Sequence, residues 1–191
     1  MILTETEIKQ AITEGLITIH DGEELKDSTC KTIKDQSIDV RLGRWLYVYD
    51  NYKQDSYWVD LDEQDFHVDP YLHFIIAHTE EFIGTTAGSG ILPTFKLKSS
   101  AGRLGIIHTL AGHWEVGYNN RWAMEFISAK PITLKRYMSI GQIYFTETVS
   151  EGWDYSTRGT YQSTSDLDTM VKNWTKESIL PPASLKVIDI I

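Results

Sequence analysis

A short polar turn, residues 98–105, carries a local pattern suited to binding an anion. It reads Lys-Ser-Ser-Ala-Gly-Arg-Leu-Gly, so two hydroxyls and a run of backbone N–H groups precede Arg103, one helical turn after Ser99. Backbone N–H groups at the start of a helix and a guanidinium group both favour phosphate oxygens. The alternative is a capped turn whose arginine is solvated, and the residues alone leave both interpretations open.

A second candidate is an acid inside an apolar segment. Residues 122–126 read Trp-Ala-Met-Glu-Phe, and this alternation is typical of a strand with one buried face. Glutamate is rarely buried without a partner or a purpose, so Glu125 is the residue that composition alone singles out. The other interpretation places Glu125 on an open sheet face in contact with water.

A zinc site is the third possibility, and the sequence argues against it. His113-Trp114-Glu115 matches the H-x-E half of a zinc nucleobase deaminase motif, but that chemistry also needs the thiolates of P-C-x-x-C. The chain has one cysteine, Cys30, far upstream, and its six histidines form no H-E-x-x-H pair. We therefore expect no zinc and no other metal held by protein side chains alone.

The elements that must position these residues are mainly strands. Thr4 and Glu7 form a capping box that begins a short helix, which Gly15 ends. Residues 20–36 read as a surface loop and residues 165–174 as a second short helix. Short β-rich runs predict strands at 37–42, 45–49, 57–61, 72–77, 94–97, 106–109, 122–127 and 142–145. Without repeats or composition breaks, we expect a single mainly β domain, a sandwich or barrel, over residues 1–191.

Charge and composition narrow the partners and the compartment. Eighteen basic and 27 acidic residues give a net charge of −9, so the chain lacks the basic footprint of a protein that binds long nucleic acid. A small anionic ligand held by one local cluster remains compatible. No apolar run approaches the roughly 18 residues of a membrane span, and the N-terminus lacks a signal-peptide pattern. With one cysteine, we expect a protein of the reducing cytoplasm that does not contact membranes.

An ordered set of segments across roughly residues 1–164 resembles the dCTP deaminases of the trimeric dUTPase-like superfamily. No segment is specific alone, but their order and spacing are. The segments are residues 1–19, 37–43 (SIDVRLG), 74–81 (FIIAHTEE), 99–105 (SSAGRLG), 111–112 (AG), 117–118 (GY), 124–126 (MEF) and 159–162 (GTYQ). The helix and tail expected at residues 165–191 extend beyond the resemblance.

The resemblance implies a fold and a reaction. The fold is a distorted β-barrel or jelly roll of the dUTPase-like type, with short N- and C-terminal helices, assembled as a homotrimer with active sites between subunits. The reaction is the hydrolysis of dCTP to dUTP and ammonia in pyrimidine deoxynucleotide metabolism. It proceeds without zinc, and Mg²⁺ is bound through the nucleotide phosphates. Whether dTTP inhibits the enzyme stays open.

The resemblance also implies roles for individual residues. Glu125 matches the general acid/base, and Ser99 and Arg103 complete the catalytic set. An ionised carboxylate would take a proton from the water that attacks C4 of cytosine, while Arg103 keeps its charge throughout. The nucleotide-binding positions are Lys98, Ser99, Ser100, Ala101, Gly102, Arg103, Ala111, Glu115, Tyr118, Ala123, Met124, Glu125, Arg158, Tyr161 and Gln162.

Departures from the family pattern keep two alternatives open. Glu115 replaces the usual Asp, His113 stands where Arg is common, and Thr160 occupies the position of a phosphate-binding Lys, whose charge Arg158 could replace. The first alternative is a dUTPase or a bifunctional dCTP deaminase and dUTP pyrophosphatase, in which Glu115 activates water at the α-phosphate. The second is a catalytically inactive nucleotide-binding regulatory trimer.

Overall fold

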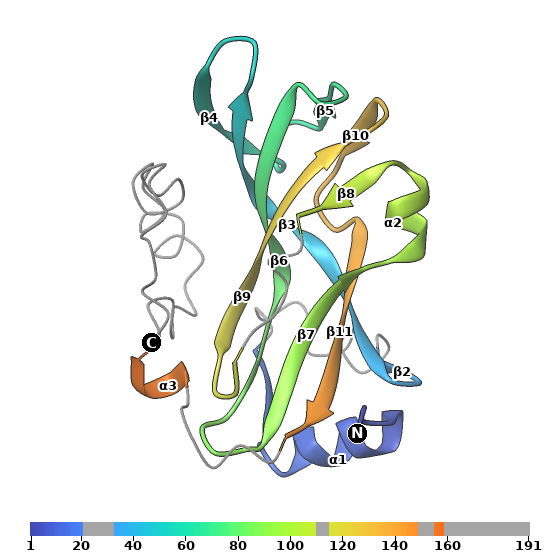
Figure 1. Ribbon diagram of the computed structural model, residues 1–191, viewed down its shortest axis with the longest axis vertical. Helices are drawn as coiled ribbons and strands as arrows, with labels where there is room; N and C mark the ends of the chain where they lie inside the picture. Colours follow the sequence, from blue (N-terminus) through green and yellow to red (C-terminus); the bar gives the residue numbers. More distant parts are fainter. Residues whose placement is uncertain (21–32, 110–114, 149–154, 159–191) are drawn as a thin grey trace, which may run out of the picture.

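A nine-stranded, barrel-like sheet dominates the protein in our computed structural model, which describes residues 1–20, 33–109, 115–148 and 155–158 (Figure 1). Its main path runs β7 (Ile91–Leu97), β11 (Ser139–Glu147), β3 (Ser37–Asp50), β6 (His73–Thr85), β9 (Asn119–Ser128) and β8 (Ile106–His108). Off this path, β1 (Ile17–His20) pairs with β6, and β2 (Ile33–Lys34) and β4 (Asp55–Asp60) pair with β3. A separate small sheet joins β5 (Phe66–Val68) to β10 (Ile132–Leu134). The expected mainly β, barrel-like fold is confirmed.

Within the described ranges, three short helices accompany the strands: α1 (Glu5–Thr13), α2 (Ser99–Arg103) and α3 (Tyr155–Arg158). The predicted capping box is confirmed, because the Thr4 hydroxyl accepts from the Glu7 N–H and the Glu7 carboxylate accepts from the Thr4 N–H. Gly15 follows the helix with a φ of 73°, a conformation that favours glycine. None of the described helices is long and apolar enough to cross a membrane.

The core is built from the inward faces of the long strands. Along β9, residues alternate between buried and half-buried positions, as expected for a strand with one face in the core. Trp122, Met124 and Phe126 are each 0% exposed. Strand β6 is almost continuously buried, which is consistent with its central place between β3 and β9.

The structure differs from the sequence-based elements in several places, and β5 and β10 match no predicted strand. The strands predicted at residues 37–42 and 45–49 are one strand, β3, whose pairing with β6 shifts register between Leu42 and Leu46. The loop predicted for residues 20–36 is wrong at β2, because Ile33 pairs with Ile38 and is only 7% exposed. The helix predicted at 165–174 lies outside the described residues.

Candidate functional site

Glu125 lies near the middle of β9, on the face opposite the core. Its neighbours Met124 and Phe126 point into the core, whereas Glu125 and Ala123 are half-buried on the outer face. Ile76 of β6 is directly opposite Glu125 across the ladder. On the other side, the Thr109 N–H and hydroxyl donate to the Glu125 carbonyl oxygen at 2.9 and 3.1 Å. The backbone of Glu125 is therefore held from both sides.

One oxygen of the Glu125 carboxyl group has no such support. The Oε2 atom is buried and has no hydrogen-bond partner among the residues that the structure describes. Burial raises the pKa of Glu125 above the ordinary glutamate value, because desolvation disfavours the charged form. An unpartnered buried polar atom is costly and rare in folded proteins. Glu125 therefore does not lie on a freely solvated sheet face, and a raised pKa is a property of many catalytic acids and bases.

The anion-binding turn predicted at residues 98–105 begins with the short helix α2, which packs beside β8 and β11 (Figure 1). Ala101 is 3% exposed and anchors the turn, whereas Ser99, Ser100, Gly102 and Arg103 are exposed. Lys98 is the N-cap, and its side chain makes no capping bond. The helix presents Ser99, Ser100 and Arg103 to solvent, so both interpretations, an anion-binding turn and a capped turn with a solvated arginine, stay open.

Lys98 differs from the rest of this turn because its ammonium group is already paired. Its Nζ atom lies 2.7 Å from the Asp39 carboxylate and 3.0 Å from the Ser139 hydroxyl. Gln142 donates to the same carboxylate at 2.9 Å, and Lys34 lies 3.3 Å from it. Burial opposes ionisation, but the bonds from Lys98 and Gln142 outweigh it and lower the pKa of Asp39. This cluster fixes the start of α2 to β3 and β11.

The predicted catalytic residues form two groups, Ser99 and Arg103 on α2 and Glu125 on β9, and no hydrogen bond or ion pair between described residues of one chain joins them. Neither Ser99 nor Arg103 makes a side-chain hydrogen bond or ion pair with any described residue. Glu125 Oε2 likewise has no hydrogen-bond partner. The structure thus leaves both groups without polar side-chain partners and does not join them in a single chain.

The other predicted nucleotide-binding residues have different environments. Met124 is 0% exposed in the core, and Glu115 is exposed at the start of a turn whose Tyr118 N–H donates to the Glu115 carbonyl at 3.1 Å. Tyr118 is 2% exposed, and its ring packs edge-on against Trp122 and Tyr155. A nucleotide contact would require these neighbours to move, so the role of Tyr118 stays a prediction. Arg158 ends α3, while Ala111, Tyr161 and Gln162 lie outside the described residues.

Sequence reasoning missed three polar residues near these two groups. Asp39 and Gln142 surround Lys98, as described above. His108 lies on β8 opposite Phe126, and its buried Nε2 atom has no hydrogen-bond partner in the part of the chain that the structure describes. Burial also lowers the pKa of His108, which keeps its imidazole neutral at neutral pH. No local pattern singles out these residues, because each depends on strands that are distant in the sequence.

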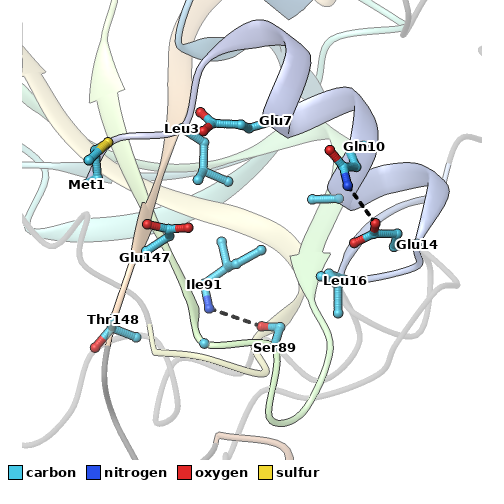
Figure 2. Close-up of a pocket in the computed structure, with 12 residues that line it drawn as sticks. Met1, Leu3, Glu7, Gln10, Glu14, Leu16, Ser89, Ile91, Glu147 and Thr148 are labelled. Atoms are coloured by element: carbon cyan, nitrogen blue, oxygen red, sulfur yellow. Dashed lines mark hydrogen bonds between the residues drawn. The ribbon is translucent and has the colours of Figure 1, made fainter.

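Neither a metal-binding cluster of described residues nor the groove beside α1 is part of the predicted site. Among the residues that the structure describes, no group of three His, Cys, Asp or Glu side chains could hold a metal ion. A groove of about 630 Å³ lies between α1 and the ends of β7 and β11, where Glu7, Glu14 and Glu147 line an apolar floor (Figure 2). None of the predicted site residues lines it, so the groove is separate from Glu125 and α2.

Comparison with known proteins agrees with the arrangement of these segments. The chain is 28% identical over 173 residues to the dCTP deaminase, dUMP-forming, of Hathewaya histolytica, covering 85% of this chain and 92% of that protein. It is 32% identical over 155 residues to the protein of the same name from Corynebacterium kroppenstedtii, covering 75% and 80%. The fold is similar to the crystal structure of 2′-deoxycytidine 5′-triphosphate deaminase from Agrobacterium tumefaciens, with a TM-score of 0.55 and 21% identity.

That structural match covers 75% of this chain and spans about half, 47%, of the longer Agrobacterium chain. The sequence model of the dCTP deaminase-like family matches residues 2–148. These residues include α2, the Asp39 cluster and the whole of β9. The chain belongs to the dCTP deaminase-like family.

Proposed function

We propose that the protein is a hydrolase that deaminates dCTP at C4 of the cytosine ring, with Glu125 as the general acid/base. The observation that carries this proposal is the buried, unpartnered Oε2 of Glu125 on an otherwise well-bonded strand. Evolution rarely retains such an atom for stability, because a partner or an apolar side chain would cost less. The relatives named dCTP deaminase identify the substrate class.

The chemistry requires one group that both takes and returns protons. The ionised Glu125 carboxylate takes a proton from water as its oxygen forms a bond to C4. The resulting carboxylic acid protonates N3. The carboxylate then takes the second proton from the new C4 hydroxyl and passes it to the amine, so that the C4=O bond forms as the C4–N bond breaks and ammonia leaves. The raised pKa of Glu125 brings this group closer to neutral pH, where proton transfer in both directions is most efficient.

A homotrimer would bring the two separated groups together. Ser99 and Arg103 of one subunit would face Glu125 of its neighbour, and a cyclic arrangement would repeat this contact three times. Arg103 keeps its charge at all relevant pH values, so it can bind phosphate without competing for the transferred proton. The exposure of α2 and its lack of side-chain partners support this arrangement.

We propose that Mg²⁺ enters with the nucleotide and that no zinc takes part. Magnesium commonly keeps several water ligands and is bound through substrate phosphates. The exposed hydroxyls and N–H groups of α2 suit such a partly neutralised triphosphate better than a protein-built metal cage. Zinc would need thiolate or imidazole ligands, and a zinc-selective chelator should leave the activity measured in excess Mg²⁺ unchanged.

A second candidate function differs from the first in its product, dUMP instead of dUTP. The initial expectation from the sequence is dUTP, whereas the relatives are named dUMP-forming, which favours the bifunctional alternative. In that case dUTP is hydrolysed further to dUMP and pyrophosphate. Glu115, exposed and close in sequence to the turn before β9, is the carboxylate we assign to activating water at the α-phosphate.

One assay separates these functions. The purified protein is incubated with dCTP and Mg²⁺, and ammonia, dUTP, dUMP and pyrophosphate are measured over time. Equal amounts of ammonia and dUTP indicate a deaminase, and equal amounts of ammonia, dUMP and pyrophosphate indicate the bifunctional enzyme. Nucleotide binding without ammonia would contradict the proposal and support the inactive regulatory trimer.

A further inference from the structure

Two irregularities in strand pairing meet next to the strand that carries Glu125. Between β3 and β6, the register changes from Leu46 opposite Ala77 to Leu42 opposite Thr79. Between β6 and β9, it changes from His78 opposite Ala123 to Phe82 opposite Arg121. At the first irregularity β3 advances four residues while β6 advances two, and at the second β6 advances four while β9 advances two. Such bulges interrupt the backbone ladder, and His78 and Thr79 lie where the two interruptions adjoin.

His78 bridges the first interruption with its imidazole ring. Its Nε2 atom accepts from the Trp45 N–H at 3.1 Å, and its Nδ1 atom lies 2.8 Å from the Thr79 carbonyl oxygen. Since a carbonyl only accepts, Nδ1 must carry the proton. The ring is 0% exposed, and burial lowers the pKa of His78 to about 3. The imidazole therefore stays neutral, which leaves Nε2 able to accept.

The fold reserves space for this ring at Gly43. A Cβ atom added to Gly43 would lie 2.0 Å from His78 Cε1, which is far inside van der Waals contact. Any side chain at position 43 would displace the imidazole from the Trp45 N–H. The hydrogen bond between His78 and Trp45 therefore requires glycine at position 43.

Thr79 bridges the second interruption. Its hydroxyl accepts from the Trp122 N–H at 2.8 Å and donates to the Glu81 carbonyl at 2.7 Å. The Arg121 guanidinium also donates to the carbonyl oxygens of Thr79 and Glu80. Side chains therefore replace the ladder bonds that the two bulges remove, and they connect β3, β6 and β9.

These bridges determine which face Glu125 occupies. The regular pairing of β6 with β9 runs from Ile75 opposite Phe126 to His78 opposite Ala123, and Glu125 lies within it. A slip of one residue would move every side chain of this segment to the other face. Glu125 would then enter the core, and Met124 or Phe126 would take its place on the outer face.

We propose that His78 and Thr79 are positioning residues that lock the register of β6 against β9 and thereby hold Glu125 on the outer face. The inference rests on the proposed role of Glu125 as the general acid/base. Neither residue needs to touch the nucleotide, because each acts through the backbone of the strand that carries the carboxylate. Their effect should therefore appear in the catalytic step more than in binding.

The test compares apolar and polar substitutions at each position. His78→Leu removes both hydrogen bonds, whereas His78→Gln restores an acceptor near the position of Nε2. Thr79→Val is close in shape but loses both bonds, and Thr79→Ser keeps them. We expect kcat for ammonia release to fall roughly tenfold or more in the Leu and Val variants, since misplacement of about 1 Å can cost more than this. KM should change by less than about threefold, because the phosphate contacts of α2 are not altered.

Two further variants separate positioning from general loss of stability. Val48→Ala creates a cavity at a fully buried position of β3 away from the irregular pairing, and it should leave kcat unchanged at temperatures where it is folded. Gly43→Ala pushes the ring aside without changing it. Its loss of kcat should match that of His78→Leu, and the double variant should be no worse than either single variant, because both changes remove the same bridge.

Failure of the positioning inference can be told apart from failure of the proposed function. Wild-type protein that releases no ammonia contradicts the proposed function. Active wild type together with folded His78→Leu at wild-type kcat overturns the positioning inference alone. If His78→Leu does not fold, Thr79→Val with wild-type kcat overturns it equally. A Val48→Ala variant that loses as much kcat as these variants also overturns it, since the effect would then follow stability rather than register.

Discussion

Helix α2 and strand β9 hold their predicted catalytic residues in opposite ways. Ser99 and Arg103 of α2 are exposed, and the turn is anchored through Ala101 and the Lys98–Asp39 ion pair. Glu125 of β9 is half-buried between β6 and β8, with an unpartnered Oε2. Ser99 and Arg103 are therefore accessible to a ligand, whereas the Glu125 carboxyl group is already partly desolvated.

This difference is consistent with two different contributions to the proposed catalysis. An exposed arginine loses little by being unpaired, and its contribution begins when an anion binds. A buried carboxyl oxygen without a partner is maintained at a cost to stability. The cost is consistent with a group whose proton affinity must be raised before substrate arrives. The two regions should therefore respond differently to substitution, pH and assembly.

The largest effect is expected for the buried group. Glu125→Gln should fold and bind dCTP but lose at least ~10²-fold in deamination rate, because the amide cannot transfer protons. Ammonia release and nucleotide affinity are measured on the same preparation. Glu147→Gln makes the same chemical change at an exposed position of β11 and should retain full activity. A Glu125→Gln variant with a tenth of the wild-type kcat would contradict the assigned role.

The next effect concerns the product and the exposed acid Glu115. If the enzyme forms dUMP, Glu115→Gln should lower dUMP and pyrophosphate formation about tenfold or more, because water at the α-phosphate loses its base. Ammonia release should continue, so dUTP accumulates. Equal loss of ammonia and dUMP would show that Glu115 serves the deamination site or the fold, and not a separate hydrolytic step.

The pH dependence should report the burial of Glu125. Its pKa is raised, and the reaction begins with the ionised form. The value of kcat/KM should therefore fall about tenfold for each pH unit below this pKa, and the break should lie above the ordinary glutamate value of about 4.3. Steady-state rates with ammonia detection provide the profile, with folding checked at each pH. A break at or below the ordinary value would contradict the desolvated environment.

The smallest effect is a contrast in stability. Glu125→Leu removes the buried unpartnered oxygen and should raise the free energy of unfolding by about 1 kcal/mol, while abolishing activity. Arg103→Ala removes an exposed, unpaired side chain and should leave this free energy within about 0.5 kcal/mol of wild type. Denaturant titrations measure both. If Glu125→Leu is the less stable protein, the carboxyl has a structural role that the single-chain contacts do not include.

The sequence alone predicts much of this contrast between α2 and β9, because the residues of both elements lie in local sequence patterns. The alternation at residues 122–126 placed Glu125 on a strand with a buried face, and the run from Ser99 to Arg103 predicted a turn or helix start. The capping box at Thr4 and Glu7 also has a fixed spacing. Each of these signals needs only neighbours a few residues away.

The bridges across the sheet could not be predicted in this way. Lys98 and Asp39 are 59 residues apart, and His78 and Trp45 are 33 apart. Their pairing depends on strand order and on bulges that leave no periodic signal. The two- and three-residue strands β2, β5 and β10 are also too short for periodicity, and only their pairing defines them.

Mixing two inactive variants tests most directly whether the site is shared between subunits. Arg103→Ala and Glu125→Gln are each refolded alone and together in equal amounts, with light scattering to confirm trimers and native mass spectrometry to confirm subunit exchange. In a cyclic trimer with shared sites, random mixing leaves one intact interface in every mixed trimer, so activity should return to about a quarter of wild type. No recovery despite proven exchange would contradict the shared site and place Arg103 and Glu125 of the same chain together.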